Sequence, residues 1–221
     1  MKFSTLSAVT ALMLAAALSA CGGKAQFAVQ GTINGLNNPG LVLANGDDRL
    51  PVAAATTSFV MPKQIPYGTD YNVTVLTNPA HQTCAPVSGG SGSAGHTVAI
   101  AVIINCVQNS YTVGGQFVGL FNKSEAVAAT ATTAAVAAVP RVVTLLNGST
   151  GGQVAVSSAA AVDTVLGKGE FVFGLPVADG SAYGVTIVPD ATSDINCTLT
   201  NNTGVVNGAA VSNMVLSCKP K

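Results

Sequence analysis

The sequence Gly-Thr-Asp-Tyr-Asn-Val-Thr-Val at residues 68–75 recurs later in the chain as Gly-Ser-Ala-Tyr-Gly-Val-Thr-Ile at residues 180–187. In both stretches an aromatic or β-branched apolar residue stands at every second position, with polar or small residues between. This period of two predicts a β-strand with one buried face and one wet face. The chain is therefore expected to contain one β-rich unit twice.

The similarity extends well beyond these two strands. Phe27–Cys106 matches Tyr111–Cys218, with an insertion at about residues 121–141 in the second copy. The start of the first copy has Phe27, Val29, Gly31, Gly35 and Leu36; the second has, in the same order, Tyr111, Val113, Gly115, Gly119 and Leu120. An internal repeat of this kind predicts two copies of one fold. We expect domains at 27–106 and 111–221, joined by a short linker at 107–110.

Short apolar stretches in the first copy predict about seven strands. They lie at residues 27–33, 41–44, 50–54, 58–61, 71–75, 83–87 and 97–106. Turn-forming Asn, Asp, Gly and Pro residues separate them. This spacing is typical of an all-β protein made of two tandem immunoglobulin-like antiparallel β-sandwiches. Tyr71 and Tyr183 fit either a tyrosine corner, in which the hydroxyl bonds nearby backbone, or plain core packing.

The chain has five cysteines, an odd number for an exported protein. If Cys21 is set aside, Cys84, Cys106, Cys197 and Cys218 allow three pairings. Two copies of one fold are expected to share one connectivity, and the cysteine spacing is nearly equal in both. This predicts disulfides Cys84–Cys106 and Cys197–Cys218. Metal-binding thiols are the alternative, but a zinc site favours closely spaced ligands and usually histidines, whereas the two cysteines of each copy stand 22 and 21 residues apart.

The N-terminus reads as an export signal. Residues 1–20 combine Lys2 with an uncharged apolar run that is too short to span a bilayer comfortably. Leu18, Ser19, Ala20 and Cys21 resemble the lipobox of bacterial lipoproteins. That resemblance implies cleavage before Cys21, lipidation of its sulfur with diacylglycerol and of its amine with a fatty acid such as palmitate, and a tether at 21–26. It further implies outer-membrane sorting, since residue 22 is Gly and not Asp. An ordinary cleaved signal with an incidental cysteine is the alternative.

The insertion at 121–141 is rich in Ala, Val and Thr. Ser124 followed by Glu125 provides a possible helix start, and Pro140 a stop, so we expect a helix between them. The β-branched residues favour an extended alternative. Variation added to a repeated scaffold is where function often resides.

The composition excludes several functions. Nine basic and nine acidic residues without a cluster of either sign do not form a nucleic-acid-binding surface. The two histidines lie near no nucleophile motif. Asp47 with Asp48, and Asp190 with Asp194, fit turns better than a calcium loop. The sequence predicts no catalytic residues, no cofactor and no metal site.

The residues of the first copy, from Gly35–Leu43 through Asp47, Asp48, Tyr71 and Cys84 to Cys106, are similar to a repeat of bacterial surface lipoproteins. The second copy departs from it by its insertion and by glycines at 148–152 in place of the paired acids. The resemblance implies an immunoglobulin-like module of the cell envelope and assigns no catalytic residues.

These features predict a membrane-anchored, non-enzymatic envelope lipoprotein that acts as a structural, adhesive or binding module. The expected partners are the membrane, through the lipid, and a glycan or another envelope protein. One alternative is an accessory enzyme or ligand carrier with a pocket at the domain interface or under the insertion. Another is a periplasmic assembly factor that uses a sheet edge.

Overall fold

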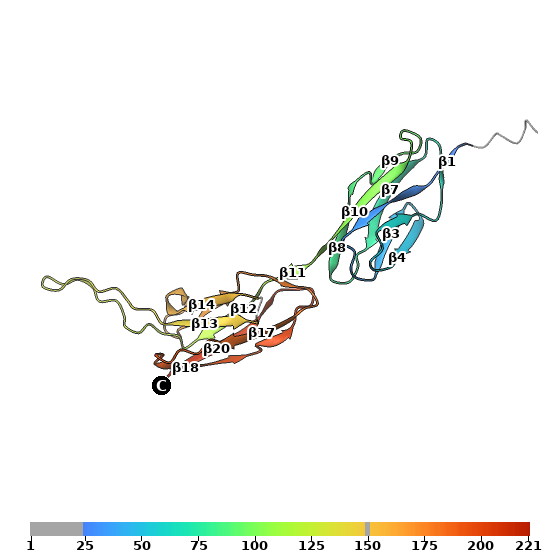
Figure 1. Ribbon diagram of the computed structural model, residues 1–221. Helices are drawn as coiled ribbons and strands as arrows, with labels where there is room; N and C mark the ends of the chain where they lie inside the picture. The colour runs from blue at the N-terminus through green and yellow to red at the C-terminus, as the bar shows by residue number, and fades with distance from the viewer. Residues whose placement is uncertain (1–23, 149–150) are drawn as a thin grey trace, which may run out of the picture. The chain divides into compact units, whose positions relative to one another are not determined.

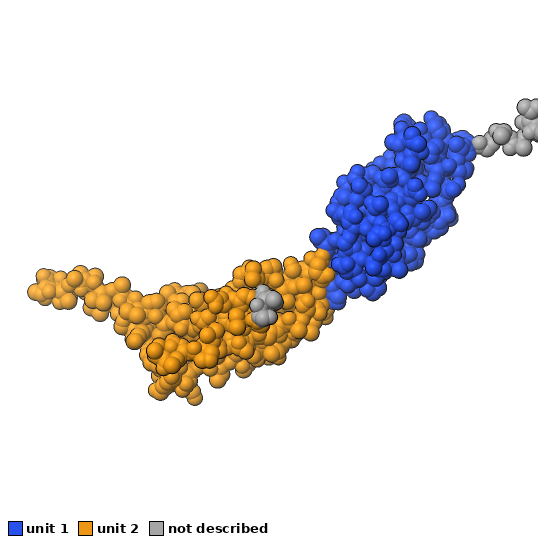
Figure 2. Space-filling view, in the orientation of Figure 1, with its two compact units in different colours: residues 1–107 blue, residues 108–221 orange. Residues whose placement is uncertain are grey.

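The computed structural model describes residues 24–148 and 151–221 (Figure 1). The lipobox residues Leu18, Ser19, Ala20 and Cys21 lie outside these residues, so signal cleavage and lipidation stay predictions. The chain divides into two compact units between Val107 and Gln108 (Figure 2). The strand at this division, Ile100–Gln108, extends one residue past it, and the next strand begins at Ser110.

The first unit is a sandwich of two four-stranded sheets. One sheet has the order β5-β2-β10-β8 and the other β4-β3-β7-β9, and a short β1-β6 pair lies at one end. The strands are β1 (Gln26–Phe27), β2 (Val29–Asn34), β3 (Leu41–Asn45), β4 (Asp48–Val52), β5 (Ser58–Val60), β6 (Ile65–Pro66), β7 (Asp70–Thr77), β8 (Gln82–Ser88), β9 (Ser91–Ser93) and β10 (Ile100–Gln108).

The core lies between the two sheets. In β10 every second side chain is buried, with Ile100, Val102 and Ile104 each at most 2% exposed. Leu43 and Val73 belong to the core of the same unit from the opposite sheet. The alternation in the sequence therefore separates side chains that face the core from side chains that face solvent.

The second unit repeats this arrangement. Its sheets have the orders β15-β12-β20-β18 and β14-β13-β17-β19, with a β11-β16 pair. The elements are β11 (Ser110–Tyr111), β12 (Val113–Val118), β13 (Val142–Asn147), β14 (Gln153–Ser157), the 3-10 helix η2 (Ser158–Ala160), β15 (Gly169–Val172), β16 (Val177–Ala178), β17 (Ala182–Ile187), β18 (Ile195–Thr200), β19 (Thr203–Val205) and β20 (Val211–Pro220). The predicted fold class, two tandem immunoglobulin-like sandwiches, is confirmed.

Each unit contains one parallel ladder that the expectation of antiparallel sheets did not include. β2 pairs in parallel with β10, and β12 pairs in parallel with β20. A parallel pair needs a long crossover between its strands. Here the crossover is the rest of the unit, because the paired strands lie near its beginning and its end.

One glycine of the repeat has the same structural task in both units. Gly35 and Gly119 both have φ of 74°, in the left-handed region that favours glycine. A Cβ on Gly35 would lie 2.4 Å from the carbonyl oxygen of Cys106, and one on Gly119 would lie 2.2 Å from that of Cys218. The turn that follows the first long strand is thus pressed against the last strand of its own unit.

The two repeated tyrosines cover glycines on neighbouring edge strands. Tyr71 pairs with Gly92, and Tyr183 pairs with Gly204. A Cβ on either glycine would lie 2.8 Å from the tyrosine hydroxyl oxygen. Both tyrosines also pack against the core of their unit. Of the two expected roles, the contacts support core packing. In addition, each aromatic ring covers a glycine on the edge strand.

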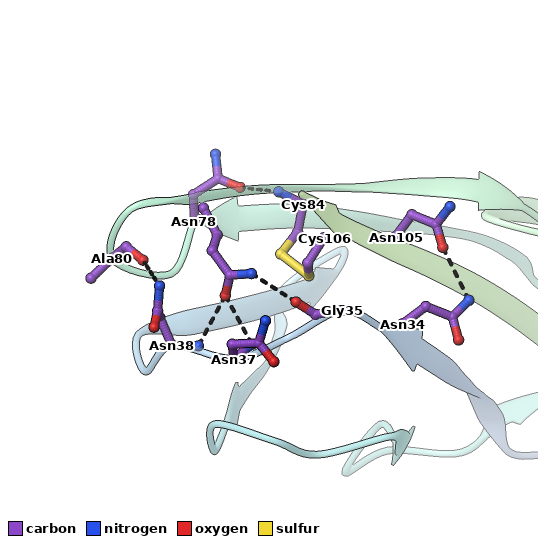
Figure 3. The surroundings of a disulfide bond; sticks show 10 residues. Asn34, Gly35, Asn37, Asn38, Asn78, Ala80, Cys84, Asn105 and Cys106 are labelled. Atoms are coloured by element: carbon purple, nitrogen blue, oxygen red, sulfur yellow. Dashed lines mark hydrogen bonds between the residues drawn. A yellow bond between two sulfur atoms is a disulfide. The ribbon is translucent and has the colours of Figure 1, made fainter. Parts of the chain in front are cut away.

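Both predicted disulfides are present in the structure. Cys84 is joined to Cys106 and Cys197 to Cys218, with Cα atoms 4.0 and 4.1 Å apart. In antibody domains the bridge joins the two sheets. Here each bridge joins neighbouring strands of one sheet, and Cys197 is the direct cross-strand partner of Cys218. Figure 3 shows the first bridge and the polar contacts around it.

Candidate functional site: an exposed arm on the second unit

The insertion forms an extended two-stranded arm, so the predicted helix is wrong. Isolated bridges join Ser124 to Val139 and Val127 to Val136 in antiparallel register. At the tip, the Thr130 backbone N–H donates to the Thr133 carbonyl over 2.9 Å, and the Thr133 N–H donates to Thr130 Oγ1 over 3.1 Å. A helix of this length gains little stability without an apolar face to bury, while the β-branched residues favour extended backbone.

The arm projects from the sandwich of its unit and is open to solvent (Figure 1). All residues from 123 to 137 are exposed. They include Val127 and Val136, which are 55% and 53% exposed, and Val139 beyond them is 48% exposed. Residues 126–139 carry no charged side chain. The arm therefore exposes an uncharged surface of Ala, Thr and Val residues.

Arg141 fastens both ends of the arm to the unit. Its Nη1 donates to the carbonyl oxygens of Phe121 and Asn122, at 3.1 and 2.6 Å, where the arm begins. Its Nε and Nη2 donate to the two carboxylate oxygens of Asp194, at 2.9 and 2.8 Å. This two-pronged geometry suits the planar guanidinium fork and orients it strongly. The base of the arm is therefore held in place.

The pair also changes the acidity of the carboxyl group. Hydrogen bonds from Arg141, together with its positive charge, lower the pKa of Asp194 from 3.8 to about 2. The pKa of Arg141 is raised by the same bonds. Both side chains retain solvent contact, with 21% of Arg141 and 49% of Asp194 exposed, so water screens the attraction. The pair therefore serves mainly to hold the base of the arm in place, and it adds little to the stability of the fold.

A second contact layer lies beside Arg141. The Arg141 backbone N–H donates to Ser158 Oγ over 2.9 Å, and that hydroxyl donates to Asn122 Oδ1 over 2.7 Å. Ser158 is buried and begins η2, which follows β14. The chain after β14 thus supports the beginning of the arm from the side.

The acidic pairs considered for calcium serve the local structure instead. Gly46 and Asp47 form the turn between β3 and β4, and the Asp48 carboxylate accepts the backbone N–H of Lys63 over 2.9 Å. Asp190 accepts bonds from the backbone and hydroxyl of Thr192, which lower its pKa. Within residues 24–148 and 151–221, no three His, Cys, Asp or Glu side chains gather into a group that could hold a metal ion.

Two hollows lie near the base of the arm. One is a cavity of about 200 Å³ whose wall includes Asn122, Glu125 and Ser158. The other is an open groove of about 530 Å³ between β13, β17 and β18, with Asp190 and Lys221 on its rim. The first unit has a groove of about 590 Å³ between β7 and β8, lined by residues 72–75 and 84–91. The larger hollow at the base of the arm is lined by strands and loops of the sandwich and by no residue of the arm itself.

Sequence reasoning located the insertion but missed the residues that hold it. Arg141 was placed at its end without a partner, and Asp194 was considered only for calcium. The two lie far apart in the sequence, and no local motif links them.

No helix in the described part of the chain is long and apolar enough to cross a membrane.

No protein-family model matches the chain, and no curated protein does so either. Among solved structures, the chain is similar to the major pilin protein T3.2 from Streptococcus pyogenes serotype GAS13637, at 10% sequence identity. The match covers 90% of this chain and 99% of the pilin, with a TM-score of 0.30. At this TM-score the two structures are only weakly similar. The fold is defined by the strand orders and registers described above.

Proposed function

We propose that this protein is a non-enzymatic lipoprotein of the bacterial cell envelope that acts as a structural or adhesive module. In this proposal Cys21 carries the lipid anchor and the two sandwiches form a stable scaffold. The arm at residues 121–141 is the contact element. Along the chain, the whole first unit separates the anchor from the arm.

The observation that carries the proposal is the arm itself. The same strand order is built twice, yet among the described residues only the second copy carries an exposed arm, uncharged over residues 126–139, whose base is fixed by Arg141. Stability of the sandwich does not require such an element, because the first unit forms the same sandwich without it. Binding functions are commonly placed on loops that a rigid scaffold supports.

The anchor rests on the lipobox residues Leu18, Ser19, Ala20 and Cys21. A single acyl chain binds a bilayer only marginally, whereas a diacylglycerol thioether with an added amide-linked chain anchors stably. Gly22 after the cysteine favours the outer membrane in this proposal.

A ligand carrier has less support. The cavity under the arm, about 200 Å³, is smaller than the ~300–1,000 Å³ of ordinary small-molecule sites. Two of its polar groups, Ser158 Oγ and Asn122 Oδ1, already bond each other. The larger groove, about 530 Å³, is open to solvent and has no residue of the arm in its lining.

Fractionation of a Gram-negative host that expresses the full chain tests the anchor. We expect the protein in the outer membrane, with a mass that exceeds the chain from Cys21 onward by a diacylglyceryl group and a fatty acyl group. Cys21→Ser should abolish the added mass and the outer-membrane location. Gly22→Asp is the matched control, because it should retain the lipid while moving the protein to the inner membrane. An unchanged mass and location in Cys21→Ser would refute the anchor.

Adhesion is tested separately with the full chain and a variant in which a short Gly-Ser turn replaces residues 124–139. We expect binding to envelope glycans, or to a purified envelope protein, to be lost with the arm while both sandwiches stay folded. Binding that is equal in the two proteins would contradict the role assigned to the arm.

A further inference from the structure

The backbone of the arm is only partly paired. Its two strands are bonded at Lys123 and Ser124 with Val139, at Val127 with Val136, and at Thr130 with Thr133. Among the described residues, the backbone N–H and C=O groups of residues 128, 129, 134 and 135 have no hydrogen-bond partner. Exposed backbone groups of extended chain are a ready template for another strand.

The two strands of the arm are also nearly the same sequence read in opposite directions. From Val127 the chain reads Val-Ala-Ala-Thr toward the tip, and from Val136 backwards it also reads Val-Ala-Ala-Thr. The register places identical residues opposite each other, because Val127 pairs with Val136 and Thr130 is hydrogen-bonded to Thr133. Both edges of the arm therefore offer the same side chains in the same order.

We infer that the partner of the arm is the arm of a second copy of this chain, joined to it edge to edge by antiparallel β-pairing. A symmetric dimer requires one surface that is complementary to itself. The arm meets this requirement, because small Ala and Thr side chains permit close approach and residues 126–139 bring no like charges together. Side chains stand on the faces of a sheet, so in such a pair the exposed valines would gain cross-strand neighbours.

This inference deepens the proposed function by naming the envelope partner as a second copy. It does not depend on the lipid. Membrane anchoring would raise the local concentration of arms by confining the copies to one surface. An arm that pairs in the absence of lipid would still satisfy the inference.

Cysteine cross-linking in the full chain tests the pairing. Ala128→Cys places a thiol near the middle of the unpaired edge, where the two copies meet close to their symmetry axis. With a mild oxidant, this variant should give a disulfide-linked homodimer on a non-reducing gel, about tenfold stronger than the control variants. The matched controls are Val165→Cys in the second unit and Val98→Cys in the first, where the native side chains are 83% and 102% exposed.

Charge on the arm provides the second comparison. Val127→Lys with Val136→Lys, added to Ala128→Cys, puts like charges at the contact and should reduce the dimer to the level of the controls. Both valines are more than half exposed, so this change should leave the fold intact. Circular dichroism of the variant checks that point.

Two results would overturn the inference: a dimer from Ala128→Cys that does not exceed the control level, or a cross-link from Ala128→Cys to a different protein. Failure of the anchor has a different signature. It would move the protein to the soluble fraction without changing the relative strength of the cross-links.

Discussion

The two units differ most at one turn, the connection after their first long strand. In the first unit, residues 35–40 make a short turn to β3, whereas in the second unit residues 119–141 include the whole arm. Both connections begin with the same left-handed glycine, pressed against the last strand. The same sandwich can therefore carry either a short turn or a long arm at this position, because both connections begin with the same glycine conformation.

The residues that hold these connections differ as well. In the first unit the buried Gln82 side-chain oxygen accepts the backbone N–H groups of Asn37 and Asn38, both at 2.9 Å, and its amide nitrogen donates to the Gly35 carbonyl at 2.7 Å. In the second unit Ile195 stands at the matching position, two residues before the cysteine. The preceding residue, Asp194, binds Arg141 instead. A buried amide fixes the short turn, and a half-exposed ion pair fixes the arm.

The largest effect is expected where the units agree. Gly35→Ala and Gly119→Ala should each destabilise their own unit by about 3 kcal/mol, since each adds left-handed strain and a Cβ that overlaps a carbonyl oxygen. Gly46→Ala and Gly148→Ala are matched controls, because they have positive φ but no atom within 4 Å of the new Cβ. These should cost about 1 kcal/mol. Amide exchange in β10 and β20 reports each unit separately, and equal losses in all four variants would contradict the close approach.

A smaller effect should appear in the first unit alone. Gln82→Leu removes the acceptor for two backbone N–H groups and the donor to one carbonyl, which should cost about 2 kcal/mol. Ile195→Leu, at the matching position of the second unit, keeps its volume and should cost less than about 1.5 kcal/mol. Denaturant unfolding followed by unit-resolved exchange measures both. If Gln82→Leu has no more effect than Ile195→Leu, the short turn does not depend on its amide.

The ion pair should give the second unit its own response to acid. The folded pKa of Asp194, about 2, lies below its ordinary value of 3.8. Its stabilising contribution is therefore complete above about pH 4 and is lost as the pH falls through 2. Arg141→Gln should raise the pKa of Asp194 toward 3.8, as measured by carboxyl NMR titration. Asp190 is the internal control, because Thr192 and not Arg141 lowers its pKa. A parallel rise at Asp190 would show that the effect is not the pair.

Local sequence patterns were sufficient for much of the scaffold. Alternation predicted strands such as β7 and β17, and the repeat predicted both disulfides, because these features depend on residue spacing within one unit. The arm was mispredicted because alanine content and Ser124 suggested a helix, while the decisive feature is pairing between residues on either side of the tip. The parallel ladders and the Arg141–Asp194 pair join distant parts of the chain, which no local pattern reports.

The central claim is that the sandwiches are complete in themselves and the arm is open for a second copy. Hydrogen exchange of the detergent-solubilised full chain at several protein concentrations tests it most directly. We expect amides at 128, 129, 134 and 135 to exchange freely in dilute solution and to gain protection as the concentration rises, while amides in β12 and β20 stay equally protected throughout. Arm amides that exchange at one rate at every concentration would contradict the account.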